Sequence, residues 1–189
     1  MRYTHEPNGL TAITAADEAA ILELNNAHEV ELSRLDGARL QHLLAVAYHA
    51  RMAPQGVAFL IAFAPDADYD GVHFSWFRER FKDFVYVDRV VVAHAARGRG
   101  IARALYADLF QRAETDGHSM ICCEVNVDPP NPASDAFHAS LGFREIGRAS
   151  MATGKVVRYF TKAVAAAKAV TATKAVTAEA KPRDEDGGG

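Results

Sequence analysis

Two carboxylates stand inside apolar segments of this 189-residue sequence. Asp88 interrupts the run DFVYVDRVVV at 83–92, and Glu124 interrupts MICCEVNV at 120–127. A carboxylate in a buried strand is costly unless it is paired or used, and proton transfer is the chemistry that uses one. We therefore predict that Glu124 and Asp88 belong to a functional site. The alternative for each is a structural ion pair, for example with Arg89.

A glycine-rich loop, Arg97-Gly98-Arg99-Gly100, connects the run at 83–92 to a helical pattern. Glycines let a backbone approach a ligand closely, and the first N–H groups of a helix lack intrahelical partners. A P-loop would need Lys and Ser/Thr after the last glycine, but Ile101 and Ala102 follow it. A dinucleotide fingerprint would need a small residue in place of Arg103. The remaining pattern, Arg-x-x-Gly-x-Ala at 97–102, predicts pyrophosphate binding without a metal, the alternative being a plain strand-to-helix turn.

A third group with acid–base capacity, His138, lies in the segment NPASDAFHASLGF at 131–143. Asn131 and the following proline are typical of a helix start. Helical spacing then places Asn131, Ser134, Asp135 and His138 on one face. The alternative is an exposed helix histidine with no role in a site.

The elements that must position these groups follow an α/β order. Helical patterns at 14–24 and 36–48, with a break at 25–28, precede a buried strand at 56–63 and a short helix at 73–81. After the strand at 83–92 we expect a helix at 100–116, a strand at 120–127, a helix at 131–142, and a closing hairpin at 144–162 turned near Thr153-Gly154. Because a helix joins the two central strands, we expect them to be parallel.

Three spaced elements between 84 and 160 resemble the GNAT superfamily of acyl-CoA-dependent N-acyltransferases. YVDRVVVAHAARGRGIARALY at 86–106 is similar to that family's strand and pyrophosphate loop. CCEVN at 122–126 is similar to the strand that splays from its neighbour so that pantetheine fits between them. The segment at 131–143 matches the family's spacing of Asn, small residue, aromatic residue and Gly-Phe. The first 80 residues match only in the order of their elements.

The resemblance implies the fold and the donor site. The expected fold is a mixed, mostly antiparallel sheet with a parallel, splayed strand pair, flanked by helices. Backbone groups of the central strand would pair with the pantetheine arm of acetyl-CoA, and the loop amides would hold its pyrophosphate. The predicted acetyl-CoA-binding residues are Val90, Val91, Val92, Arg97, Gly98, Arg99, Gly100, Ile101, Ala102, Arg103, Asn131 and Ser134.

The resemblance also implies a direct transfer of the acetyl group to a primary amine. Some members carry their base at the position of Glu124, and others carry an acidic substrate-binding residue at that of Asp88. His138 stands where the family usually has the tyrosine that protonates the CoA thiolate. The predicted catalytic residues are therefore Glu124, His138 and Asp88. Cys122 and Cys123 point to opposite faces of a strand, so we expect neither a disulfide between them nor a nucleophile.

Composition narrows the partners. A net charge of −3 gives no indication of binding to nucleic acid or to an anionic membrane. The two adjacent cysteines are typical of a protein in a reducing cytosol, so we expect a cytoplasmic protein. DADYDG at 66–71 resembles a calcium loop but lacks its glutamate, and no histidine has zinc-ligand spacing, so we expect no metal. With 25–36, this acidic loop is expected to line the acceptor entrance and to favour a cationic amine.

We predict one acetyltransferase domain at 1–161 and a flexible Ala/Lys/Thr-rich tail at 162–189, where KAV recurs without aromatic residues. The leading function is N-acetylation of a small amine. The alternatives are acetylation of protein N-termini or lysines, and a non-catalytic acyl-CoA-binding module. The acceptor, the acyl-chain length and the oligomeric state stay open, and a homodimer is compatible with the sequence.

Overall fold

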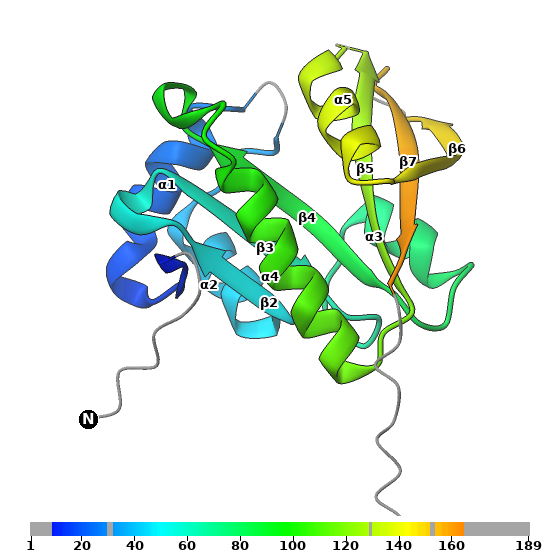
Figure 1. Cartoon of the computed structure of the whole chain (residues 1–189), viewed down its shortest axis with the longest axis horizontal. Coiled ribbons are helices and arrows are strands. Elements are labelled where there is room, and N and C mark those ends of the chain that lie inside the picture. Colours follow the sequence, from blue (N-terminus) through cyan, green and yellow to red (C-terminus); the bar gives the residue numbers. More distant parts are fainter. Residues whose placement is uncertain (1–8, 30–31, 129, 152–153, 165–189) are drawn as a thin grey trace, which may run out of the picture.

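The computed structural model describes residues 9–164, apart from 30–31, 129 and 152–153. Within these residues, seven strands form one sheet in the order β1-β2-β3-β4-β5-β7-β6. Neighbouring strands are antiparallel except β4 and β5, which are parallel. The structure confirms the predicted mixed sheet with one parallel pair and flanking helices (Figure 1).

The sequence pattern predicted all the main elements except the two short strands β1 and β2, which are too short to show a period. The strands are β1 (Thr11–Ala12), β2 (His49–Met52), β3 (Ala58–Phe63), β4 (Val85–Val92), β5 (Met120–Asp128), β6 (Arg144–Ser150) and β7 (Val156–Ala163). The α-helices are α1 (Glu18–Asn26), α2 (Gly37–Val46), α3 (Val72–Arg78), α4 (Ile101–Asp116) and α5 (Pro132–Ser140).

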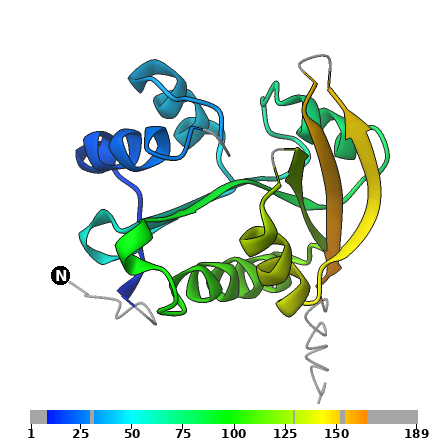
Figure 2. The same ribbon diagram turned by 90° about the horizontal axis from the view of Figure 1, so that it is seen from above.

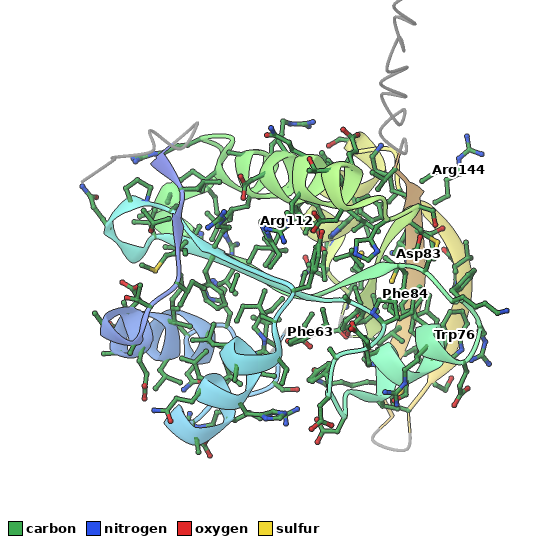
Figure 3. The ribbon with its side chains drawn as sticks, turned by 90° about the horizontal axis from the view of Figure 1, so that it is seen from below. Phe63, Trp76, Asp83, Phe84, Arg112 and Arg144 are labelled. Atoms are coloured by element: carbon green, nitrogen blue, oxygen red, sulfur yellow. The ribbon has the colours of Figure 1, made fainter. Side chains whose placement is uncertain are left out.

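One apolar cluster lies on each face of the sheet. Helix α4 packs on one face, and helices α1, α2 and α3 cover the other (Figure 2). In Figure 3 the side chains of Phe63 and Phe84 lie inside the molecule, whereas Arg144 projects from β6 at the sheet edge. Each fully buried Leu or Phe contributes about 1.5–3 kcal/mol, so the two clusters hold the helices firmly against the sheet.

The parallel strands β4 and β5 pair only where they begin. Val85 pairs with Ile121 and Tyr86 with Cys122, and beyond these two pairs the strands diverge (Figure 1). The gap therefore opens toward the carboxyl ends of both strands. The glycine loop and α4 follow β4 at that end, and α5 follows β5.

Two local predictions differ from the structure. Helix α1 continues through Asn26, so Asn25 and Asn26, which were expected to break the helix, lie in its last turn. Strand β7 runs to Ala163 and Val164 is buried, so the sheet continues past the predicted domain boundary at residue 161. The rest of the predicted tail, 165–189, and Thr153 of the predicted hairpin turn lie outside the described residues. No helix in the described part of the chain is long and apolar enough to cross a membrane.

Candidate active site

A cavity of about 460 Å³ lies where β4 and β5 diverge. Its walls come from β4, the glycine loop, the start of α4, β5 and the start of α5. His28 and Leu32, from the segment that was expected at the acceptor entrance, also line it. Arg99 does not line the cavity. The predicted site residues that do are Asp88, Val90, Val91, Val92, Arg97, Gly98, Gly100, Ile101, Ala102, Arg103, Glu124, Asn131, Ser134 and His138.

The glycine loop presents a helix start to this cavity. Gly98 and Gly100 have left-handed backbones, with φ of +76° and +78°, and no heavy atom lies within 4 Å of where a Cβ would stand. The carbonyl of Gly100 accepts from the N–H of Ala104 at 3.0 Å, which begins α4. The first N–H groups of α4, from Ile101 onward, therefore lack intrahelical acceptors. These N–H groups and the positive end of the helix dipole favour an anionic group such as a phosphate.

The edge of β4 that faces the cavity has the geometry of an unfinished sheet. Val90, Val91 and Val92 pair with β3 on one side. On the other side, among the described residues, β5 pairs with β4 only as far as Tyr86. Alternate N–H and C=O groups of β4 therefore face the gap, where an extended, amide-containing arm can pair with them.

Asp88 lies at a β-bulge and forms a buried ion pair. Ile61 pairs with Arg89 and Ala62 with Val87, which leaves Asp88 as the extra residue. The Asp88 carboxylate accepts from Arg89 Nε at 2.6 Å and from the Tyr69 hydroxyl at 2.5 Å. Both side chains of the ion pair are only 6% exposed. The ion pair with Arg89, considered above as the structural alternative for Asp88, is thus present.

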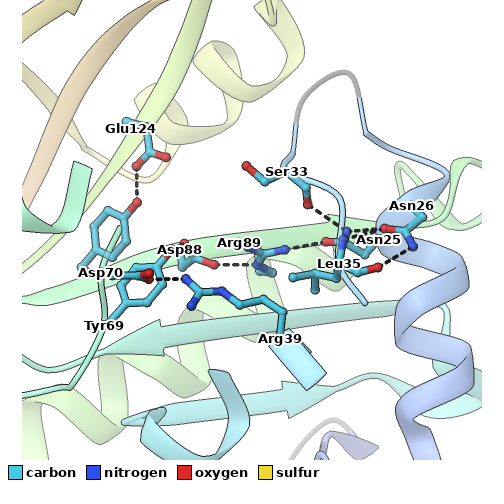
Figure 4. A network of polar contacts seen from close by, with 11 residues as sticks. Asn25, Asn26, Ser33, Leu35, Arg39, Tyr69, Asp70, Asp88, Arg89 and Glu124 are labelled. Atoms are coloured by element: carbon cyan, nitrogen blue, oxygen red, sulfur yellow. Dashed lines mark hydrogen bonds and ion pairs between the residues drawn. The ribbon is translucent and has the colours of Figure 1, made fainter. Parts of the chain in front are cut away.

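The Asp88 ion pair is the centre of a longer network that reaches α1. Arg89 Nη1 donates to Oδ1 of the fully buried Asn25 at 2.8 Å. Asn25 and its neighbour Asn26 bind backbone groups of Ser33 and Leu35, so this network also fixes these two residues ahead of α2 (Figure 4).

Glu124 is in a different environment, although it lies on the neighbouring strand. Its carboxylate accepts a hydrogen bond from the hydroxyl of the fully buried Tyr86 at 2.8 Å. Burial raises the pKa of Glu124 to about 8, and the charge of Asp88 adds to this, against the hydrogen bond from Tyr86. A carboxyl group that titrates near pH 8 is suited to taking a proton from an ammonium group and releasing it again.

His138 is buried, which excludes the exposed-histidine alternative. Its Nδ1 lies 2.8 Å from the carbonyl oxygen of Ser134, so this nitrogen carries the hydrogen of the neutral ring and donates it there. Its Nε2 lies 2.8 Å from the hydroxyl oxygen of Tyr106 on α4. Burial lowers the pKa of His138, which keeps the ring neutral at neutral pH. Asp135, on the same helix, forms its ion pair with Arg158.

Sequence reasoning gave no individual role to Asn25, Tyr69, Tyr86 or Tyr106, although Asn25 and Tyr69 belong to the segments expected at the acceptor entrance. Strand alternation carried a signal for Tyr86, which stands two residues before Asp88. Tyr69 belongs to the acidic loop at 66–71, and that loop contributes to the site through this phenol. The described residues contain no group of three or more His, Cys, Asp or Glu side chains arranged to hold a metal ion.

The model of the Acetyltransferase (GNAT) family matches residues 27–143. This span covers the segment after α1, the whole of β4 to α5, and every residue that lines the cavity.

Two curated proteins share part of the sequence. A phosphinothricin N-acetyltransferase of Streptomyces coelicolor is 40% identical over 72 residues, which is 38% of this chain and 40% of that protein. An L-2,4-diaminobutyric acid acetyltransferase of Wolinella succinogenes is 28% identical over 82 residues, which is 43% of this chain and 47% of that protein. The likeness therefore spans less than half the length of either relative.

A solved structure shares the fold. The phosphinothricin acetyltransferase of Sinorhizobium meliloti, in complex with acetyl-CoA, superposes with a TM-score of 0.61 at 19% sequence identity. The superposition covers 89% of this chain and 95% of that one.

Proposed function

This chain belongs to the acetyltransferase (GNAT) family, and we propose that it transfers an acetyl group from acetyl-CoA directly to the primary amine of a small molecule. One observation carries this proposal. A single cavity joins a helix start suited to a pyrophosphate, an unpaired strand edge suited to an amide-containing arm, and a carboxyl group with a pKa of about 8.

We assign the donor end of the cavity to acetyl-CoA. The amides of the loop and of Ile101, Ala102 and Arg103 would hold the pyrophosphate, and the edge of β4 would pair with the pantetheine arm. Asn131 and Ser134 stand across the cavity at the start of α5, where Asn131 Oδ1 accepts from the Ser134 N–H at 3.1 Å. The acetyl-CoA in the S. meliloti structure of the same fold supports this assignment.

The acceptor end of the cavity carries the two carboxylates. Glu124 would take a proton from the ammonium group of the acceptor, so that the nitrogen lone pair can attack the thioester carbon. Asp88, which Arg89 and Tyr69 hold in place, would favour the cationic acceptor by its charge. As the carbon–sulfur bond breaks, the sulfur leaves as a thiolate that needs a proton. We assign the source of that proton to the α4–α5 side of the cavity, where His138 lies.

The acceptor class is proposed from the relatives. The names of both curated relatives specify small molecules, phosphinothricin and L-2,4-diaminobutyric acid, as the compounds that those proteins acetylate. We therefore favour a small amine over a protein N-terminus or a lysine side chain.

Release of free CoA thiol tests this proposal. The protein is incubated with acetyl-CoA and a panel of L-2,4-diaminobutyrate, phosphinothricin, polyamines, amino acids and alanine-initiated peptides. Cys122 and Cys123 are both buried, and a blank with protein but no acetyl-CoA corrects for any reaction of their thiols with the reagent. We expect release that depends on a small amine. Release with peptides alone would support protein acetylation, and acetyl-CoA binding without release would support a binding module.

Gly100→Val tests the donor end separately. Gly100 has a left-handed backbone, and a β-branched residue there would be strained and would place a side chain beside the helix start. We expect at least a tenfold loss of acetyl-CoA affinity in a titration calorimeter. Gly117→Val is the matched control, because Gly117 ends the same helix with a φ of +84° and equally open surroundings. Equal affinities for the parent and Gly100→Val would refute the loop assignment.

A further inference from the structure

A hydrogen bond across the cavity wall joins two residues that lie 32 positions apart, Tyr106 on α4 and His138 on α5. Both residues line the cavity. Aromatic rings surround the pair and fix its geometry: Tyr106 meets Phe137 edge-on at 5.4 Å, and His138 meets Phe143 edge-on at 5.2 Å.

The direction of this hydrogen bond follows from the other contact of the imidazole. The Ser134 carbonyl oxygen can only accept, so Nδ1 of the neutral ring carries its single hydrogen. Nε2 is then an acceptor, and the Tyr106 hydroxyl is the donor. The one N–H of His138 is therefore engaged with the backbone of α5. The hydrogen shared between the two side chains therefore belongs to the phenol.

We propose that Tyr106 is the residue that gives a proton to the departing CoA thiolate, with His138 as its positioning partner. The proposal rests on the acetyl transfer proposed above. When the carbon–sulfur bond breaks, its electron pair stays on sulfur; the O–H bond of Tyr106 then breaks, an S–H bond forms, and a phenolate remains. The phenolate regains a proton from water after CoA leaves. The acceptor nitrogen loses one proton to Glu124 before it attacks and a second one after the C–N bond has formed, and both pass to solvent. The Tyr106 phenolate takes one proton back from solvent, so each ammonium group that reacts yields one amide, one CoA thiol and one released proton.

The surroundings of the Tyr106 hydroxyl favour donation to a sulfur. It lies beside the thiol of Cys123, which also lines the cavity. Burial raises the pKa of Tyr106 well above 10, and it raises the pKa of the Cys123 thiol as well. A thiolate formed at this wall would lose solvation in the same way and bind a proton strongly. A hydrogen bond to a charged acceptor is stronger than one to a neutral ring nitrogen, so the phenol hydrogen would turn from His138 to the thiolate.

Three variants test the proposal, assayed by CoA release with L-2,4-diaminobutyrate or with whichever panel amine reacts faster. Tyr106→Phe removes only the hydroxyl, and we expect kcat to fall roughly 10²-fold, the lower end for a general acid, while acetyl-CoA affinity stays within about twofold. His138→Phe should cost less, about tenfold, because the phenol remains. The swap Tyr106→Phe/His138→Tyr returns a phenol to the same wall and should recover most of the loss. Tyr48→Phe, which removes a hydroxyl bound to Asp116 away from the cavity, should match the parent.

Each other result would overturn the assignment. A Tyr106→Phe variant with the parent kcat would show that water protonates the thiolate. A larger loss in His138→Phe than in Tyr106→Phe would return the role of acid to the histidine. A swap variant that binds acetyl-CoA normally but recovers no activity would show that Tyr106 acts through packing. A parent that releases no CoA with any amine contradicts the proposed acetyl transfer itself, and this inference with it, and is recognised before any variant is made.

Discussion

Asp88 and Glu124 lie on neighbouring strands, line one cavity and each accept a hydrogen bond from a tyrosine, but they differ in whether a guanidinium group binds them. Tyr69 donates to Asp88 and Tyr86 donates to Glu124, so the phenols do not distinguish the two carboxyl groups. Arg89 distinguishes the two carboxyl groups, because its guanidinium donates to Asp88 and to Asn25 but not to Glu124. The comparison teaches that a guanidinium holds Asp88 in an ion pair, whereas Glu124 has only a phenol as its side-chain partner. Burial raises the pKa of Glu124 to about 8.

The largest expected effect comes from removing the negative partner of Arg89. Asp88→Asn leaves a guanidinium in a site that is only 6% exposed, so we expect the free energy of unfolding to fall by about 3–5 kcal/mol in urea denaturation. The matched control is Glu79→Gln, which breaks an exposed pair between adjacent residues, Glu79 and Arg80. That change should cost less than about 1 kcal/mol. Equal losses in the two variants would mean that the buried pair is not special.

Glu124→Gln tests the other side of the comparison through activity. Glu124 is mainly protonated below its pKa of about 8 and can act as a base only when ionised. The parent kcat should therefore rise with pH toward 8, and Glu124→Gln should lack this rise. We expect kcat of Glu124→Gln to be roughly 10²-fold below that of the parent at pH 8.5 and much closer to it at pH 6. The difference in kcat should also become smaller at high pH, where the amine is already deprotonated in solution. A loss independent of pH would indicate a structural role, and Asp88→Asn would then be profiled the same way.

The smallest expected effect is that of Glu124→Gln on the free energy of unfolding. The folded pKa of Glu124 lies above its ordinary value near 4.5, so the folded state binds this proton more tightly than the unfolded state does. The resulting stability is fully present below pH 4.5 and is lost as pH rises toward 8. The amide of Glu124→Gln does not titrate, so this variant should be more stable than the parent at pH 9. We expect its free energy of unfolding to be higher by about 2 kcal/mol, which includes a reduction because the side chain contacts water in the cavity. Unfolding curves at pH 5 and pH 9 measure this, and an advantage of the same size at both would contradict it.

Local patterns were sufficient to place the glycine loop before a helix. Gly98, Gly100 and the start of α4 are consecutive in sequence, so spacing alone predicted the loop, and the structure adds the left-handed backbone of both glycines. The strands β4 and β5 and their parallel pairing followed from apolar runs joined by a helix.

The buried polar contacts around the cavity depend on distant segments of the chain. Asn25 looked like a helix breaker because its polar side chain has no visible partner in the sequence, but that partner is Arg89, 64 residues later. Tyr106 looked like an ordinary helix residue, because nothing near it in sequence indicates that His138 will stand opposite. Whether a buried polar side chain is satisfied is a property of packing, and it becomes visible only when the elements are assembled.

The short ladder between β4 and β5 has a consequence for hydrogen exchange. The antiparallel strands β1 to β4 and the antiparallel strands β5, β7 and β6 form the two halves of the sheet. Only the two residue pairs between β4 and β5 connect these halves within the sheet of the described residues. Amides of β4 that face the gap exchange with solvent when the cavity is empty and become protected when an extended arm fills it. Protection of the gap-facing amides in residues 87–92 would thus report directly on ligand binding, because no strand of the described protein pairs with that part of the edge of β4.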